Sequence, residues 1–169
     1  MRVVKRPRSI GWLVALSMCA ACGDDGGDDS ADEMTHPHVD GSFPEAPCPE
    51  NTPEFRINLQ ATGEEGAVVA QLIDADHIPP RKNRNNWTIE FLDTDDMALE
   101  DAELTMARPF MPVHGHDGIY EPEVTALDEP GRYQVDGLNL WMTGPWQVQL
   151  TVASESAGDD YIVFNVCVD

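Results

Sequence analysis

This chain of 169 residues has little positive charge. It contains 10 Lys and Arg against 31 Asp and Glu, which gives a formal net charge of −21. Nucleic acids and anionic membrane surfaces are bound through basic patches, and the one basic cluster, Arg81-Lys-Asn-Arg84, is too small for nucleic acid. The composition therefore excludes nucleic acid as a partner. It does not identify a positively charged partner, because many exported proteins are acidic for solubility.

The sequence also lacks the motifs of the common catalytic sites. It has no nucleophile elbow, no His-Glu-x-x-His pair and no glycine-rich phosphate loop. Pairs of carboxylates are expected by chance in a chain with 31 Asp and Glu, so they do not indicate acid–base catalysis. We therefore expect a protein that is not an enzyme.

The first residues have no acidic side chain and predict an export signal. Four basic residues precede an apolar run over residues 10–18, which is shorter than the roughly 20 apolar residues that span a bilayer. Ala20 and Ala21 then precede Cys22, a pattern that resembles a bacterial lipobox, although Cys19 stands where Leu is usual. We expect residues 1–21 to be a lipoprotein signal peptide and Cys22 to carry the lipid that anchors the protein to the membrane. The anchored protein would lie in the cell envelope, facing the periplasm or the cell exterior. The alternative is an ordinary secretory signal cleaved nearby, which would still export the chain.

Residues 22–47 have almost no apolar side chains and predict a disordered acidic linker. His36 and His38 lie in this stretch, where we expect solvated side chains rather than metal ligands. Residues 48–169 then suit one domain with its own core. Removal of residues 1–21 removes four basic residues and no acidic one, so the mature net charge is about −25.

Two cysteines remain for the domain, Cys48 near its start and Cys167 near its end. An even pair in an exported protein predicts a disulfide. It would close a loop of about 119 residues, worth on the order of 3–5 kcal/mol in the chain-entropy account. A metal site with two thiolates is the alternative, but neither end supplies further His or Cys ligands.

Alternating apolar residues predict an all-β domain. No segment keeps a helical period, and turn residues separate the predicted strands at 63–66, 79–86, 93–96, 129–131 and 144–145. Seven or eight strands in this length fit an immunoglobulin-like β-sandwich, and we expect residues 161–168 to form a central strand because they are apolar on both faces. The residues expected to share a face within each strand are Phe55, Ile57 and Leu59; Trp87, Ile89 and Phe91; Leu104 and Met106; Tyr133 and Val135; Leu138 and Leu140; and Trp146, Val148, Leu150 and Val152.

Residues 68–152 resemble the YtkA-like domain, which is related to FixH-type and other small β-sandwich modules of the bacterial envelope. The resemblance rests on Met111-Pro-Val-His-Gly-His116, Pro130-Gly-Arg-Tyr133, Gly137-Leu-Asn-Leu140 and Met142-x-Gly-x-Trp146, in that order along the chain. It implies the sandwich fold. Members of the family are often suggested to bind copper or to assist oxidase assembly, so it also implies a copper-related role or an envelope protein partner.

The same segments offer a candidate metal site. His114 and His116 are separated by one glycine, so in an extended segment both imidazoles would point to one side, with Met111 and Met142 as thioether candidates. Imidazole with thioether suits Cu(I), and imidazole with a carboxylate such as that of Asp117 would favour Cu(II) or zinc. In the structural interpretation the methionines fill the core, Trp141 and Trp146 pack in the sandwich, and His114 holds the loop. Both interpretations stay open at the level of sequence.

Two further sets of polar residues are weaker candidates. The acids of Asp93-Thr-Asp-Asp-Met-Ala-Leu-Glu100 are spaced as in a calcium loop, but the glycine that such a loop needs at its sixth position is missing. We expect a solvated hairpin turn there. His77 follows Asp74 and Asp76, and no other feature of the sequence supports it as a third imidazole ligand.

Overall fold

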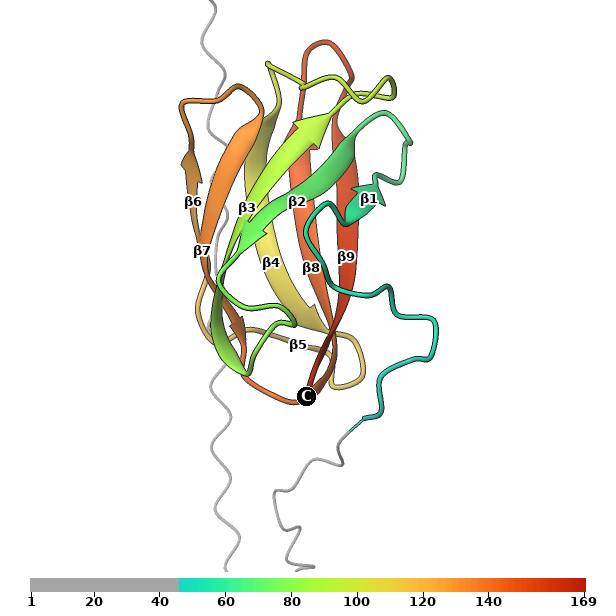
Figure 1. The fold of residues 1–169 in the computed structure, drawn as a ribbon, viewed down its shortest axis with the longest axis vertical. Helices are drawn as coiled ribbons and strands as arrows, with labels where there is room; N and C mark the ends of the chain where they lie inside the picture. Colours follow the sequence, from blue (N-terminus) through green and yellow to red (C-terminus); the bar gives the residue numbers. More distant parts are fainter. Residues whose placement is uncertain (1–45) are drawn as a thin grey trace, which may run out of the picture. The chain divides into compact units, whose positions relative to one another are not determined.

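The computed structural model describes residues 46–169, so the predicted signal peptide, Cys22 and most of the predicted linker lie outside the described residues. Residues 46–169 form nine β-strands, which are labelled in Figure 1. Their bounds are β1 Gln60–Thr62, β2 Val69–Ala75, β3 Asn83–Leu92, β4 Glu103–Met111, β5 His116–Asp117, β6 Glu123–Ala126, β7 Arg132–Leu140, β8 Gly144–Ala153 and β9 Asp160–Val168.

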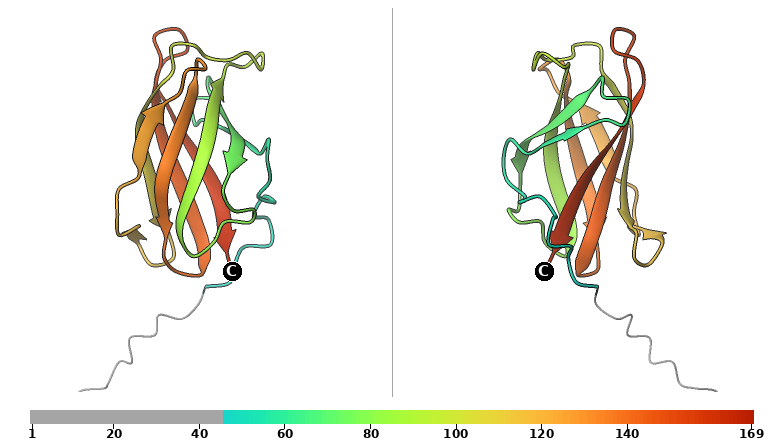
Figure 2. Two further views of the ribbon diagram at one scale, coloured as in Figure 1. Left: turned by 60° about the vertical axis from the view of Figure 1, so that its left-hand side comes forward. Right: turned by 90° about the vertical axis from the view of Figure 1, so that its right-hand side faces the viewer.

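The strands form two antiparallel sheets packed face to face as a sandwich (Figures 1 and 2). One sheet has five strands in the order β1-β2-β3-β7-β6, and the other has four in the order β5-β4-β8-β9. The all-β sandwich predicted from the sequence is confirmed. The strand number exceeds the expected seven or eight because β1 and β5 are only three and two residues long, too short to produce an alternating pattern.

Alternating side chains of the long strands fill the space between the sheets. Trp87, Ile89 and Phe91 of β3 are fully buried, as the period of two predicted. On the facing sheet, every second residue of β8 from Trp146 to Val152 is at most 1% exposed. Full burial of one such side chain stabilises the fold by roughly 1.5–3 kcal/mol, so these two strands supply much of the hydrophobic stabilisation.

Residues 55–59 do not form the strand that their spacing predicted. Asn58 has a φ of 64°, and this left-handed conformation interrupts an extended backbone. The segment is held beside β2 instead, because the N–H of Asn58 donates to Leu72 O and the N–H of Leu72 donates to Leu59 O, at 2.8 and 2.9 Å. Phe55 is still only 8% exposed, so its apolar side chain is in the core without belonging to a strand.

Two other strand predictions are wrong for reasons of pairing. Leu104 and Met106 were expected on one face, but the ladder between β4 and β8 shifts between them. This bulge leaves Leu104 6% exposed and Met106 37% exposed. The last strand, β9, was expected to be central but lies at the edge of its sheet. The N–H of Glu64 donates to Tyr161 O at 2.9 Å, so the turn before β2 covers part of this edge.

The predicted turn at residues 63–66 is confirmed, and a buried carboxylate holds it against β9. Asp160 is 4% exposed and accepts four backbone N–H bonds, from Glu65 and Tyr161 to Oδ1 and from Ala67 and Val68 to Oδ2. Burial alone raises the pKa of Asp160, but the four donors outweigh it and hold the pKa below its ordinary value. The turn at residues 93–96 is also confirmed, and there Asp93 Oδ1 accepts from the N–H groups of Asp95 and Met97, both at 2.9 Å.

The predicted disulfide is present. Cys48 and Cys167 are bonded across a sequence separation of 119 residues, with their Cα atoms 5.9 Å apart. Disulfides of this kind persist in oxidising compartments, so the bond indicates a location outside the cytoplasm. Within residues 46–169, no helix has the length and apolar character needed to cross a membrane.

Candidate functional site

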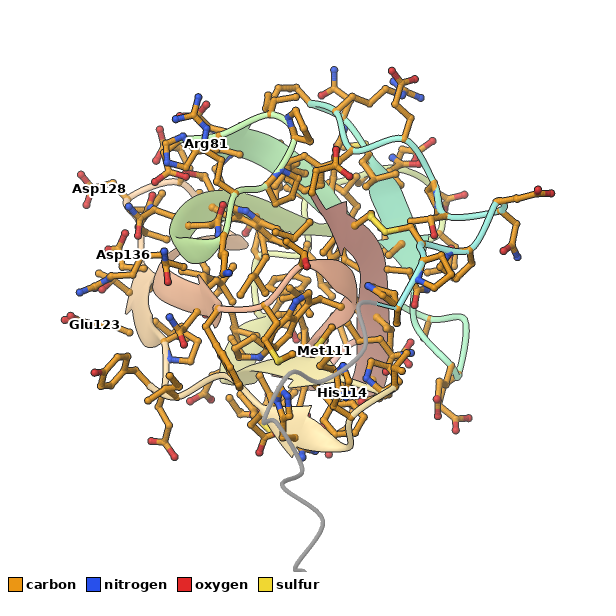
Figure 3. The ribbon with its side chains drawn as sticks, turned by 90° about the horizontal axis from the view of Figure 1, so that it is seen from below. Arg81, Met111, His114, Glu123, Asp128 and Asp136 are labelled. Atoms are coloured by element: carbon orange, nitrogen blue, oxygen red, sulfur yellow. A yellow bond between two sulfur atoms is a disulfide. The ribbon has the colours of Figure 1, made fainter. Side chains whose placement is uncertain are left out.

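The candidate ligands lie at one end of the sandwich, where β4 turns back into β5 (Figure 3). The turn covers residues 112–115, and both His114 and Gly115 donate their N–H to Met111 O, at 3.2 and 2.9 Å. Gly115 has a φ of 67°, a conformation that glycine adopts without strain. The two histidines therefore do not lie in one extended segment. They lie in and just after a tight turn.

The thioether of Met111 and the imidazole of His116 lie on the same face of this sheet. Met111 and His116 are directly opposite each other in the β4–β5 ladder, and side chains in that relation point the same way, with Cβ atoms about 4.5–5.5 Å apart. Met111 is fully buried, so the shared face is the one that faces the core. The expected association of Met111 with the His116 side chain is thus built into the strand register.

The imidazole rings of His114 and His116 are nearly parallel. Their centroids are 5.8 Å apart and their planes differ by 5°. A metal bound to a ring nitrogen at about 2.0–2.1 Å lies roughly 3.2 Å from the ring centroid, so two rings on one ion have centroids separated by at most about 6.4 Å. The observed separation is within this limit. An ion bound to both rings must lie in both ring planes, so the stacked rings would have to rotate out of their parallel orientation to share one.

The orientation of the His116 ring is fixed by a backbone carbonyl. Its Nδ1 lies 3.1 Å from Asp117 O, and since a carbonyl oxygen only accepts, Nδ1 carries the proton. In the neutral ring, Nε2 is then the nitrogen with the lone pair. Nε2 is buried and has no hydrogen-bond partner among the described residues. A carbonyl that holds one ring nitrogen while the other is directed inward is the usual support of a metal-binding histidine.

Two tryptophans enclose the same imidazole. The ring of Trp141 stacks on His116 with centroids 4.9 Å apart, and Trp146 meets it edge-on at 5.8 Å. Trp141 Nε1 donates to Asp117 O at 3.4 Å, and Trp146 Nε1 donates to Met142 O at 2.9 Å. The turn between β7 and β8, which contains Met142, therefore lies beside the histidine turn. The Met142 side chain is partly buried against the core.

Comparison with known protein families identifies the domain. Residues 64–151 match the YtkA-like family, a range that runs from the turn before β2 almost to the end of β8 and covers more than half of the chain. The chain belongs to the YtkA-like family. Among curated proteins and solved structures, none matches it significantly.

The remaining candidate ligands of this YtkA-like protein do not join the histidine pair. Asp117 directs its carboxylate to Arg108, with Oδ1 2.7 Å from Nη2 and 2.8 Å from Nε, so the carboxylate forms an ion pair. His77 lies beside Asp76, with Nε2 4.0 Å from Oδ2. Nowhere in residues 46–169 do three or more His, Cys, Asp or Glu side chains gather as they would around a metal ion.

Sequence reasoning named the histidines and the tryptophans but missed how they are connected. The link is the main-chain oxygen of Asp117, which accepts from both His116 and Trp141. Any residue provides such an oxygen, so the sequence carries no signal for this role. The stacking of Trp141 on His116 joins β5 to the turn after β7, and no local spacing could have indicated it.

Proposed function

We propose that this YtkA-like protein is a non-enzymatic copper-binding module of the cell envelope, in which His114 and His116 hold Cu(I) and a methionine completes the site. The observation that carries the proposal is the proximity of the two imidazoles, whose centroids are 5.8 Å apart at the end of β4 and which would rotate out of their stacked orientation to share the ion. Met111 is the better placed thioether because it lies opposite His116 in the ladder. Met142, on the neighbouring turn, is the second.

The ligand types favour Cu(I) over zinc and Cu(II). Structural zinc sites take four nitrogen, sulfur or oxygen ligands, whereas the part of the chain that the structure describes offers two imidazoles here and no further His, Cys or carboxylate group around them. Cu(I) is a soft ion that accepts thioether ligands and low coordination numbers. The aromatic rings of Trp141 and Trp146 around His116 would keep water away from such a site.

The export features fit this role. The predicted lipidation of Cys22 would hold the domain at the membrane surface, and the Cys48–Cys167 disulfide is consistent with an oxidising compartment outside the cytoplasm. A copper-binding module in that position would hold or pass on copper for envelope proteins without carrying out a reaction itself.

The test is competitive Cu(I) titration of the mature protein with ascorbate as reductant, followed through tryptophan emission. Because Trp141 and Trp146 lie against His116, copper bound there should quench their fluorescence. The His114→Ala, His116→Ala double variant should lose binding and quenching, and Met111→Leu should weaken binding at nearly constant side-chain volume. His77→Ala is the matched control and should bind as the unaltered protein does. If the double variant binds Cu(I) with unchanged affinity, the proposal is wrong.

A second candidate is a metal-free structural or protein-interaction module of the envelope. It is favoured by the packing of His116 between the tryptophan rings and by the full burial of Met111, which would serve the fold without a metal. In that case the double histidine variant should lower the melting temperature, and copper should stabilise neither protein. If Cu(I) raises the melting temperature of the unaltered protein but not that of the double histidine variant, this candidate is excluded.

A further inference from the structure

A groove of about 640 Å³ runs along one side of the sandwich. One wall is β4, and the other is the segment of residues 117–122 that leads from β5 to Val124 of β6. Figure 2, left, shows this segment following the side of the sandwich between the two sheets. The groove thus lies where an edge of the four-stranded sheet approaches an edge of the five-stranded sheet.

The β4 wall of the groove presents unpaired backbone groups. One edge of β4 pairs with β8 over most of its length. On the opposite edge, which faces the groove, only Phe110 and Met111 pair with β5, and no described strand pairs with Glu103 to Arg108. Pro109 O points away from β8, because it accepts from the N–H of Gly118 at 2.8 Å. In an antiparallel strand every second residue faces the same side, so the N–H and C=O of Ala107 also point into the groove. An edge of this kind is a template for an added strand.

Apolar side chains surround this edge. Met106, Ile119 and Tyr120 all line the groove, and they are 37%, 62% and 67% exposed. Large apolar side chains that are exposed singly are ordinary on a protein surface, but a group around one groove marks an interaction site. The groove therefore combines hydrogen-bonding groups for a backbone with apolar surface for alternate side chains, which is the combination that binds an extended peptide.

The charged residues around the groove indicate which kind of segment it binds. The charged residues that line the groove are Arg108, Asp117 and Glu121, and the first two neutralise each other as an ion pair. Glu121 remains, and Glu103 and Glu123 are exposed at the starts of β4 and β6, so the rim is negative. A second copy of the chain would bring the same acidic rim. Residues 22–45 of the chain itself contain eight Asp and Glu and no Lys or Arg, so they would be repelled as well.

We propose that this groove docks an extended segment of a partner protein in which apolar and basic side chains alternate, and that the segment joins β4 as an additional strand. The docked backbone would pair with Ala107. Its apolar side chains would contact Met106, Ile119 and Tyr120, and its basic side chains would meet the glutamates of the rim. The inference goes beyond copper binding and does not depend on it.

The test uses the whole mature protein and a ten-residue peptide of alternating Val and Lys. Two peptides serve for comparison, one with Glu in place of every Lys and one with Pro in place of the central Val, because proline removes a donor from the ladder. We expect the Val/Lys peptide to shift the amide resonance of Ala107 and slow its hydrogen exchange. Both comparison peptides should bind at least tenfold more weakly.

Matched variants separate the groove from general attraction to an acidic protein. The Ile119→Ser, Tyr120→Ser double variant removes apolar surface from the groove, and Ile78→Ser, Met97→Ser removes comparable exposed side chains elsewhere. Only the groove variant should weaken binding of the Val/Lys peptide, by tenfold or more. Equal effects of the two variants, equal binding of the Glu peptide, or no shift at Ala107 with the peptide at millimolar concentration would overturn the proposal. A dimer that the groove variant dissociates would also overturn it, because the occupant would then be a second copy.

Discussion

Replacement of Asp160 by Asn tests whether one carboxylate holds the turn at residues 63–66. The two side chains have nearly the same shape, but Asn offers one acceptor oxygen where Asp offers two. Each Asp160 oxygen accepts two backbone N–H bonds, at 2.8 to 3.2 Å. The amide group of Asn would therefore face two N–H donors, whichever way it is turned, and two hydrogen bonds would be lost.

The magnitude follows from those two donors. A buried donor left without an acceptor costs about 1–3 kcal/mol. Three of the four bonds are only partly buried, so Asp160→Asn should lower the free energy of unfolding by about 2–3 kcal/mol. That is a large share of the roughly 5–15 kcal/mol that stabilises a typical domain. The carboxylate lies against Gly63, where an added Cβ would overlap it.

Urea unfolding followed by the emission of the buried Trp87 and Trp146 measures the difference. The matched control is Asp159→Asn, at the exposed neighbouring position, which should change stability by no more than about 0.5 kcal/mol. The pKa of Asp160 is lower in the folded state, so its contribution is fully present above the unfolded pKa of about 3.9. This contribution is lost as the pH falls through the folded pKa. The difference in free energy of unfolding between the unaltered protein and Asp160→Asn should therefore become smaller there. This account is refuted if Asp160→Asn and Asp159→Asn are equally stable at pH 7. It is also refuted if the difference in free energy of unfolding between the unaltered protein and Asp160→Asn stays constant into acid.

Two further predictions concern the core and the disulfide. Leu150 is fully buried in the inner strand β8, so Leu150→Ala should lower the free energy of unfolding in urea by about 2–5 kcal/mol. Leu127→Ala, at a 37% exposed position, should lower it much less. Similar losses in the two variants would contradict the assigned core. The Cys48→Ser, Cys167→Ser variant should lose about 3–5 kcal/mol, because the bond closes a loop of 119 residues, and reduction of the unaltered protein should reproduce that loss in a thermal melt.

Local patterns predicted the fold where each strand is regular. In β3 and β8 the inward residues alternate without interruption and all are buried, so the sequence alone identified the faces. The predictions failed where the backbone departs from a regular strand. The left-handed Asn58 ends the pattern at residues 55–59, and the bulge after Leu104 turns Met106 outward. Both depend on pairing with a distant strand, which residue spacing does not encode.

In the candidate site, too, the local arrangement was predictable from the sequence and the contacts between separate strands were not. Met111, His114 and His116 are close in sequence and are joined by one turn, so their proximity followed from spacing. The sequence also named Met142 as a thioether candidate. It could not predict that Trp141 stacks on His116 or that the oxygen of Asp117 orients the ring, because these contacts join separate strands of the sandwich.

The position of the disulfide also decides how the protein responds to force. Cys48 and Cys167 each lie within two residues of an end of the described chain. Tension applied between residues 46 and 169 passes through the sulfur–sulfur bond and leaves the sandwich unstretched. Tension between Cys48 and a partner held on β4 takes another path, from β9 through β8 to β4, across two antiparallel ladders. The four-stranded sheet would then carry load between Cys48 and that partner.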